Sequence, residues 1–470
     1  MSKNLYATTA IPYVNGAPHI GHALDYLLAD VYVRYQKEQG NTVRLQAGTD
    51  EHGNKIFDKA KSTNIPVEDY VKQNSDKFRD FISELGVEPT DFIRTSDPDH
   101  IRRVQLIWQK LAPHIYSANY EGWYCSGCES FITDKEYAEN HGICPDHQKP
   151  YERLVEKNYY FRISDFKDQI ENAIVTGELK ILPDFRKNEI LKLLRDAPDV
   201  SVSRPKKNLS WGIPVPDDDD QIMYVWLDAL SNYITVLGYP EQDIADYWPA
   251  DLQIVGKDIL RFHAIIWPAM LLALGLPLPK TILSHGYILS NGQKMSKSIG
   301  NIVDPFEILH KYGLDPFRYF FLRHIDTFAD SDFDWSKFDA AYSGELANDL
   351  GNLVQRLAVL SNKNSVNLPE ITIARDSEYE KLMDSFEFSK AFDYVWAKIQ
   401  DLNKEINDLA PWTVAKTNPE KAKEILINLD LKLLSTIHLL KPFLPNTAEK
   451  ITNIFSATTI TPPEPLFPKQ

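Results

Sequence analysis

The spacing of apolar residues predicts a strand, a helix and a second strand at the start of the chain. Residues 4–10 favour a β-strand, and the loop around Gly16 and Pro18 ends it. Apolar side chains then recur at the helical spacings of three and four, at Ile20, Ala23, Leu24, Leu27, Leu28, Val31 and Tyr35. Residues 42–47 have the pattern of another strand. This order implies parallel strands, with ligand sites beyond their carboxyl ends.

The pattern changes twice further along the chain. Residues 252–255 and 281–283 are apolar runs typical of buried parallel strands, whereas only helical periodicity remains from Leu346 onwards. All three cysteines lie in the intervening polar region. We therefore predict an α/β fold: a Rossmann-type parallel sheet in two halves, residues 1–115 and 222–285, an inserted domain at 116–221, a loop-bearing region at 286–345 and an all-α bundle at 346–470.

Composition limits the classes of function. Hydrophobic residues make up 43% of the chain and charged residues 25%, as in soluble enzymes, and no window has the roughly 20 apolar residues that span a membrane. Residues 1–16 carry neither an export nor an import signal, so a cytoplasmic location is expected. The net charge of -15 argues against non-specific affinity for polyanions. A nucleic acid would have to be bound locally.

His19 and His22 begin the first predicted helix. The free N–H groups and the dipole of a helix N-terminus attract anions, and a spacing of three places both rings on one face. Gly21 lets a flat nucleotide base approach the backbone. On these residues alone, a pair of capping or core histidines is an equally good interpretation.

Residues 294–298, Lys-Met-Ser-Lys-Ser, lie between Gly292 and Gly300, which indicates a mobile loop. Its two ammonium groups can stabilise charge that develops on a departing polyphosphate. Alone, such a loop is more often solvated surface. Together with the histidine pair and the interrupted sheet, it resembles the signature of the class I aminoacyl-tRNA synthetases, which implies adenylate formation from ATP.

Further motifs narrow the resemblance to the methionyl-tRNA synthetases. They are residues 10–16 (Ala-Ile-Pro-Tyr-Val-Asn-Gly), 48–53 (Gly-Thr-Asp-Glu-His-Gly), 224–229 (Tyr-Val-Trp-Leu-Asp-Ala) and 256–259 (Gly-Lys-Asp-Ile), followed by His263 and Trp267. The match extends from Leu5 to at least Trp412. It implies that the chain activates methionine with ATP and transfers it to tRNA(Met), and that residues 286–345 include a contact to the tRNA stem.

The resemblance also implies roles for single residues. Those implied to bind ATP are His19, Gly21, His22, Asp258, Lys294, Lys297 and Ser298, of which the two histidines and two lysines are catalytic and the aspartate holds the ribose. Those implied to bind methionine are Ile11, Tyr13, Asp50, Trp226, Ala229, Tyr233, Ile259 and His263, with Trp267 beside them. Asp50 and the Ile11 carbonyl would bind the ammonium group. Aromatic rings suit a thioether because polarizable sulfur contacts ring edges favourably, although ordinary core is the alternative. Mg²⁺ should accompany ATP.

Cys125, Cys128, Cys144 and His147 form two ligand pairs, C-x2-C and C-x2-H. Four such ligands favour tetrahedral Zn²⁺, and a site with no open position is structural. The alternative is three reduced, buried thiols. The resemblance implies a zinc knuckle in the inserted domain, and a single ligand set predicts one zinc.

Asn352 and Arg356 lie four residues apart on one face of a predicted helix, and Trp412 follows Pro411. An amide and a guanidinium can read the edges of unstacked bases, and an indole can stack on a base. Without the resemblance, Arg356 would be a surface ion pair and Trp412 a core residue. The resemblance implies that the three residues bind the CAU anticodon of tRNA(Met).

Three other functions are compatible with parts of the sequence. A class I synthetase for cysteine, leucine, isoleucine or valine is the nearest, but about 105 inserted residues are too few for the editing domain of the branched-chain enzymes. The helical third argues against an adenylyltransferase for a small acid, and the intact His19, His22, Lys294 and Lys297 argue against a catalytically silent tRNA-binding protein. A monomer is expected, because the chain ends before a C-terminal dimerising domain could fit.

Overall fold

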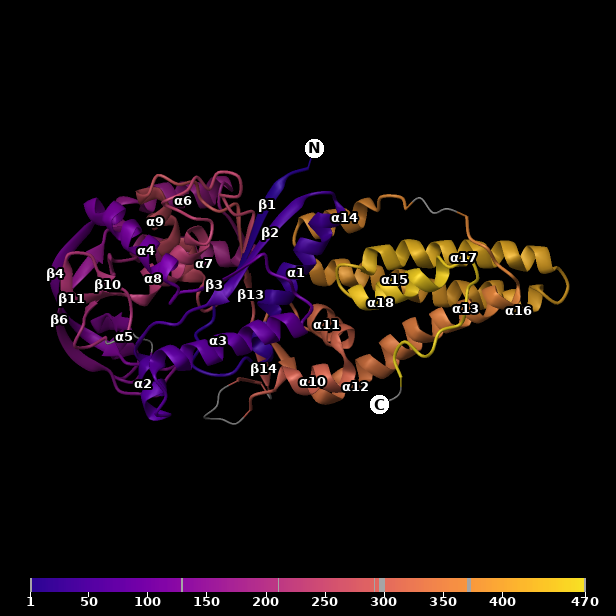
Figure 1. Ribbon diagram of the computed structural model, residues 1–470, viewed down its shortest axis with the longest axis horizontal. Helices are drawn as coiled ribbons and strands as arrows, with labels where there is room; N and C mark the ends of the chain where they lie inside the picture. The colour runs from indigo at the N-terminus through magenta and orange to yellow at the C-terminus, as the bar shows by residue number, and fades with distance from the viewer. Residues whose placement is uncertain are drawn as a thin grey trace.

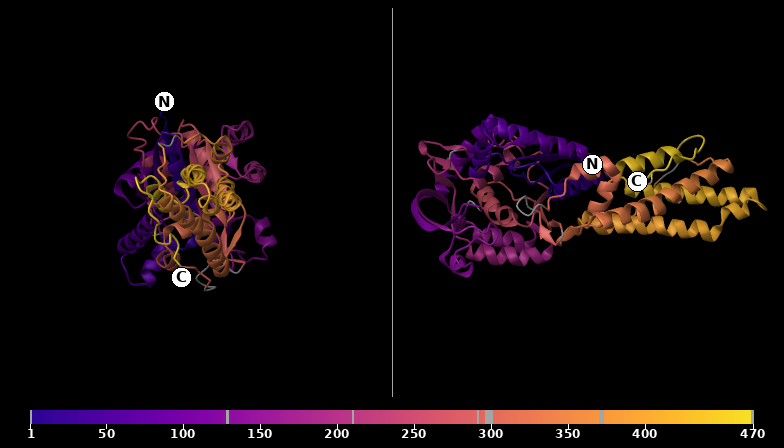
Figure 2. Two further views of the ribbon diagram at one scale, coloured as in Figure 1. Left: turned by 90° about the vertical axis from the view of Figure 1, so that its right-hand side faces the viewer. Right: turned by 90° about the horizontal axis from the view of Figure 1, so that it is seen from below.

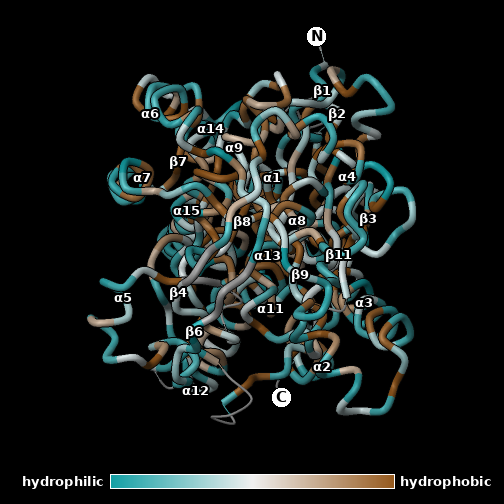
Figure 3. Tube along the Cα trace, turned by 90° about the vertical axis from the view of Figure 1, so that its left-hand side faces the viewer, coloured by the Kyte–Doolittle hydropathy of each residue, from teal (hydrophilic) through white to brown (hydrophobic). Residues whose placement is uncertain are grey.

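The computed structural model describes residues 2–127, 130–209, 211–290, 292–295, 301–369 and 373–468. An α/β region and a helical bundle lie end to end, and the long helices of the bundle follow the long axis of the molecule (Figures 1 and 2). Seen along that axis, hydrophobic residues gather towards the centre, while the outlying helix α5 is largely hydrophilic (Figure 3). Among the described residues, no helix is both long enough and apolar enough to cross a membrane.

The α/β region is built on a six-stranded sheet in which every pair is parallel, in the order β3-β2-β1-β12-β13-β7. The strands are β1 (Asn4–Thr9), β2 (Thr42–Thr49), β3 (Asp91–Arg94), β7 (Lys180–Leu182), β12 (Leu252–Gly256) and β13 (Thr281–His285). This confirms the predicted α/β fold with a parallel sheet. β2 and β12 flank β1 although they are far apart in the chain, so the connections diverge at β1. Ligands of such sheets bind where the connections diverge.

Helices cover both faces of the sheet. Side chains alternate along β1: Leu5 and Ala7 join the core that holds α1 (Ala23–Glu38), whereas Tyr6 joins the core on the opposite face. The opposite core holds residues of α4 (Pro98–Leu111), α6 (Lys167–Thr176), α7 (Asp184–Asp196), α8 (Val225–Thr235) and α9 (Trp267–Ala273). Both faces of the central strands are therefore buried, as their continuous apolar runs predict.

A long antiparallel ribbon stands at the end of the α/β region farthest from the bundle (Figure 1). It consists of β4 (Ile115–Cys125) and β6 (Glu152–Phe161), extended by β5 (Ser130–Ile132) and β8 (Val200–Ser201), with α5 (Asp134–Glu139) beside it. A small sheet follows, made of β9 (Ser203–Pro205), β10 (Pro214–Val215) and β11 (Asp218–Met223).

One strand of the main sheet comes from within residues 116–221, the range assigned to an inserted domain. β7 pairs with β13 through Ile181 and Ile282, and α6 and α7 flank it in the chain. A three-residue strand has too few positions to show a period, so the sequence did not reveal it. The limits of the insertion stay a prediction, and β7 belongs to the parallel sheet by its hydrogen bonds.

Helices α2 (Asn54–Ser62) and α3 (Val67–Glu84) connect β2 to β3. After β13, shorter elements lead to the bundle: β14 (Ile288–Ser290), β15 (Gln293–Lys294), α10 (Pro305–Tyr312), α11 (Leu314–Arg323), β16 (Ser331–Phe333) and α12 (Trp335–Ala340). The elements described in the bundle are all helices, as predicted. A π-helical stretch, Ala341–Gly351, leads into α13 (Asn352–Lys363). The helices that follow are α14 (Ser377–Asp384), α15 (Phe388–Leu409), α16 (Pro411–Val414), α17 (Pro419–Leu440) and α18 (Pro445–Phe455).

Arg318 joins the bundle to the α/β region. Its guanidinium is fully buried, pairs with Asp30 of α1 at 2.7 Å, and donates to the backbone oxygens of Pro442 (2.9 Å) and Phe443 (2.7 Å). The two carbonyls lie between α17 and α18. A buried guanidinium needs such a complete set of acceptors, so the helix that follows the histidine pair is tied to the bundle at a defined position.

Candidate active site

A cavity of about 480 Å³ lies at the carboxyl edge of the sheet. Every described residue predicted to bind ATP or methionine lines it: Ile11, Tyr13, His19, Gly21, His22, Asp50, Trp226, Ala229, Tyr233, Asp258, Ile259, His263 and Lys294. Lys297 and Ser298 fall outside the described residues. Side chains that are far apart in the sequence thus form one concave site, where connections on either side of β1 diverge.

The two histidines cap a short 3₁₀ turn, Ile20–His22, that leads into α1. His19 Nδ1 accepts from the Gly21 N–H at 3.1 Å, and His22 Nδ1 accepts from the His19 N–H at 3.1 Å. The ring centroids are 3.9 Å apart. Burial and the adjacent His19 hold the pKa of His22 well below its usual range, so this ring is neutral at pH 7. The two histidines do cap the turn, as one interpretation of the sequence predicted, and the capped turn also lines the cavity.

The lysine loop meets the histidine turn at Gly21. A Cβ at Gly21 would lie 2.8 Å from the His19 ring, so a larger residue does not fit, and 3.5 Å from Cε of Met295. Met295 is buried and lines the same cavity. The two motifs, separated by most of the α/β region in sequence, therefore lie against one another in space.

Lys294 lines the cavity beside Asp258, the residue expected to bind the ribose. Its Nζ donates to the Tyr287 hydroxyl at 3.2 Å, lies 4.3 Å from the centre of that ring, and is 3.6 Å from Asp258 Oδ2. Lys257 also lies 4.3 Å from the Tyr287 ring centre. The Tyr287 ring thus contacts two ammonium groups, of which that of Lys294 lies beside the carboxylate expected to bind the ribose and that of Lys257 pairs with Asp330 at 2.7 Å.

The opposite part of the cavity is aromatic. Trp226 stacks on Phe262 with ring centroids 3.7 Å apart, and the Tyr233 hydroxyl lies 2.7 Å from His263 Nε2. His263 Nδ1 lies 3.0 Å from the Ile259 carbonyl, which accepts only from an N–H, so we assign the proton to Nδ1 and let Nε2 accept from the tyrosine. Burial lowers the pKa of His263 to about 4, consistent with a neutral ring.

Of two further residues predicted near the methionine pocket, Asp50 lines the cavity and Trp267 does not. Asp50 is buried at the end of β2, where its backbone N–H donates to the Pro12 carbonyl at 2.9 Å. Its backbone is therefore held next to that of Tyr13, its side chain lines the cavity, and its carboxylate accepts from the His52 N–H at 3.4 Å. Trp267 is fully buried and does not line the cavity; its Nε1 donates to Gln253 at 3.2 Å. It supports the pocket from behind.

Several polar residues line the cavity without having been predicted, among them Asp25, Lys55, His285 and Tyr287. His285 Nε2 lies 3.2 Å from Asp25 Oδ2. Burial lowers the pKa of His285, but the facing Asp25 raises it, and the pKa lies above its ordinary value. Lys55 lies two residues after the motif at residues 48–53, and Tyr287 precedes the lysine loop. Their nearness to recognised motifs was the one signal that could have found them.

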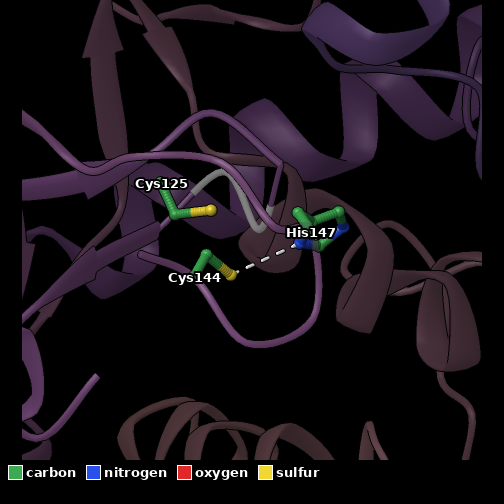
Figure 4. A group of neighbouring side chains, drawn as sticks. All are labelled: Cys125, Cys144 and His147. Atoms are coloured by element: carbon green, nitrogen blue, oxygen red, sulfur yellow. Dashed lines mark hydrogen bonds between the residues drawn. The ribbon is translucent and has the colours of Figure 1, made fainter. Parts of the chain in front are cut away.

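Cys125, Cys144 and His147 form a cluster in which the ligand atoms lie within 4.8 Å of one another (Figure 4). Cys144 Sγ is 3.6 Å from His147 Nδ1. A Cβ at Gly127 would lie 2.3 Å from the His147 ring, so the glycine allows this close approach. Cys128 falls outside the described residues. Two buried thiols and an imidazole at these distances are a donor set that can hold a metal ion.

The residues predicted to bind the anticodon lie on the bundle. The Arg356 guanidinium lies 4.8 Å from the centre of the Trp412 ring and also donates to Asn407. Trp412 is 39% exposed, which is unusual for a tryptophan and leaves a face for stacking. Asn352 is exposed on the same helix as Arg356 and donates to Asn348 at 3.3 Å.

A parallel sheet with a histidine turn and a lysine loop at its carboxyl edge, joined to a helical bundle, is the arrangement of a class I aminoacyl-tRNA synthetase. The family model for "tRNA synthetases class I (M)" matches residues 5–155 and 147–358, and that for the "Anticodon binding domain of methionyl tRNA ligase" matches residues 360–466. The chain belongs to the methionyl-tRNA synthetase family.

Individual relatives agree along the whole chain. The methionine–tRNA ligase of Caldanaerobacter subterraneus is 39% identical over 96% of this chain and 74% of its own length, and that of Rickettsia bellii is 38% identical over 98% and 94%. A structure of Mycobacterium tuberculosis methionyl-tRNA synthetase in complex with methionyl-adenylate superposes with a TM-score of 0.90 at 33% identity, covering 99% of this chain and 100% of that one.

Proposed function

We propose that this protein activates L-methionine with ATP to methionyl-adenylate and then transfers the methionyl group to tRNA(Met), releasing AMP and pyrophosphate. The observation that carries the proposal is the single cavity in which the histidine turn, Met295 of the lysine loop and an aromatic pocket meet. Charging of total tRNA with labelled methionine tests it. We expect ATP-dependent incorporation that RNase removes, and the absence of incorporation would refute the proposal.

In the first step, the methionine carboxylate attacks the α-phosphorus of ATP and pyrophosphate leaves. His19 and His22 would bind the nucleotide at the capped turn and Asp258 the ribose, while Lys294 and Lys297 would stabilise the charge on the leaving pyrophosphate. Mg²⁺, when bound with ATP, would neutralise part of the phosphate charge. In the second step, a terminal ribose hydroxyl of the tRNA attacks the adenylate carbonyl and AMP leaves. Positioning and charge stabilisation supply the rate enhancement.

The neutral surroundings of the aromatic pocket support methionine as substrate. Asp50 would bind the ammonium group, and Trp226, Tyr233 and His263 would surround the thioether. The Tyr233 hydroxyl is already engaged with His263, so this donor is not left unpaired beside an apolar side chain. A residue with a charged side chain would lose its hydration without gaining a partner.

Zinc is the metal that best suits the cluster of Cys125, Cys144 and His147, with Cys128 as the fourth ligand. We expect about one zinc per purified chain, held without a catalytic role. In the Cys144→Ser variant a thiolate ligand is lost, and metal analysis should find the zinc content greatly reduced. A Ser126→Ala variant, with an exposed residue changed in the same loop, is the control. Full zinc content in Cys144→Ser would contradict the assignment.

Trp412→Ala tests whether the exposed indole stacks on an anticodon base. Base–aromatic stacking is worth about 1–3 kcal/mol, so KM for tRNA should rise by roughly 5- to 150-fold. Methionine-dependent ATP–pyrophosphate exchange, which requires no tRNA, should stay unchanged. Leu409→Ala, another exposed apolar residue of the bundle, is the matched control. An equal loss in both assays would indicate damage to the fold instead of a lost base contact.

The protein is also proposed to act as a monomer in the cytoplasm. One chain supplies both the catalytic cavity and the candidate anticodon surface, so no second copy is needed to complete a site. Size-exclusion chromatography at micromolar concentration should give the mass of one chain, and a stable dimer would overturn this part of the proposal.

A further inference from the structure

Two motifs that mark the family meet in a buried hydrogen bond to which the two-step reaction assigns no role. His52 of the motif at residues 48–53 places Nδ1 2.6 Å from Oδ2 of Asp228 in the motif at residues 224–229. His52 is 3% exposed and Asp228 1% exposed. Neither side chain lines the cavity, so neither would touch a substrate.

A third side chain completes the network. His100 of α4 places Nε2 2.7 Å from Asp228 Oδ1, and its Nδ1 lies 2.7 Å from the Thr235 hydroxyl at the other end of α8. Burial alone would raise the pKa of Asp228, but the facing His52 and His100 hold it below its usual range. The carboxylate is therefore ionised, and each oxygen accepts from one histidine N–H. One helix is held from two sides through a single carboxylate.

The residues beside this network belong to the proposed methionine site. Asp50 precedes His52 by two positions and is bonded through its backbone to Pro12, next to Tyr13. On α8, Trp226 and Ala229 lie on either side of Asp228 in sequence and line the cavity. The His52–Asp228 bond thus sets the separation between the carboxylate proposed for the ammonium group and the wall proposed for the thioether.

We propose that His52 and His100, acting through Asp228, are positioning residues for methionine, holding α8 and residues 50–52 at the separation at which both ends of the amino acid are bound together. The inference rests on the proposed function and specifies how its methionine site is held. Apolar residues of similar volume generally stabilise a core as well as a buried charge network does. The network's contribution is therefore geometric, and it acts on methionine more than on ATP.

The test compares His52→Ala with His52→Asn in ATP–pyrophosphate exchange. Alanine removes the donor to Asp228, whereas the amide nitrogen of asparagine can take the place of Nδ1 and donate. We expect His52→Ala to raise KM for methionine by about 10- to 100-fold and to change KM for ATP by less than about twofold, since small displacements of binding groups have effects of this size. His52→Asn should recover most of the loss. Calorimetric titration with methionine alone should give the same order of affinities.

Two controls separate positioning from general stability. Ser361→Ala removes a comparable buried bond to a carboxylate, 2.6 Å from Asp430 inside the bundle, and should leave both KM values unchanged. If His52→Ala does not fold, His100→Gln and His100→Leu replace it, because glutamine can donate from the place of Nε2 and leucine cannot.

The outcomes are distinguishable. No methionine-dependent exchange by the natural protein refutes the proposed function, and this inference with it. With exchange present, equal changes in KM for methionine and ATP, no change at all, or no recovery in the asparagine variant would overturn the positioning role alone.

Discussion

Alanine in place of Lys297 is expected to slow methionine-dependent ATP–pyrophosphate exchange by about 100- to 1000-fold, the usual cost of removing one transition-state donor. The ammonium group interacts most strongly with charge that develops as pyrophosphate leaves, so KM for methionine should change little. Lys294→Ala should have a similar effect, because Lys294 lines the cavity 3.6 Å from Asp258, the residue proposed to bind the ribose. Steady-state exchange kinetics measure both quantities.

Lys421→Ala is the matched control for these variants. Lys421 is an exposed lysine of α17 that pairs with Glu424 at 2.9 Å, in the bundle and outside the cavity lining. Its loss should leave exchange unchanged. A normal rate in Lys297→Ala, or an increase in KM for methionine as large as the decrease in rate, would show that the lysine loop does not stabilise the transition state.

The second large effect is expected for Asp50→Asn. Asparagine preserves the size of the side chain and the backbone bonds to Pro12 and Val14, but it presents no negative charge to the methionine ammonium group. Removing one member of a buried charge pair costs about 2–5 kcal/mol, so methionine affinity should fall by roughly 30- to 5000-fold. Affinity for ATP should be maintained. Calorimetric titration with each ligand separately measures the two affinities.

Asp76→Asn provides the comparison for Asp50. Asp76 is an exposed carboxylate on α3 that pairs with Lys72 at 2.6 Å. Neutralising it removes the same charge from the protein without changing the cavity, so methionine affinity should be unaffected. Similar affinities in Asp50→Asn and Asp76→Asn would mean that the ammonium group is bound elsewhere.

The elements with a strong local pattern were predictable from the sequence. Helix α1 carries apolar residues at helical spacing as far as Tyr35, and β12 and β13 are short, mostly apolar runs with no helical period. β7 was not predictable, because a strand of three residues shows no period and its partner β13 lies about 100 residues later. Its place is decided by long-range hydrogen bonding.

The features of the candidate site also divide into those that the sequence could reveal and those that it could not. His19 and Lys294 were identified because their types and positions suit nucleotide chemistry, and Asp258 because the family resemblance implied its role; the structure brings the three to one cavity. The role inferred for His52 could not be seen in the sequence, since its partner Asp228 is 176 positions away and a buried hydrogen bond between distant side chains has no local pattern. The proton on His263 Nδ1 likewise depends on a contact with the Ile259 carbonyl.

The central claim is that the histidine turn, the lysine loop and the aromatic pocket form one site for ATP and methionine. The most direct measurement is ATP–pyrophosphate exchange with the purified protein and each standard amino acid in turn. We predict rapid exchange with methionine and background rates with leucine, isoleucine, valine and cysteine. Faster exchange with any other amino acid, or no exchange with methionine, would contradict it.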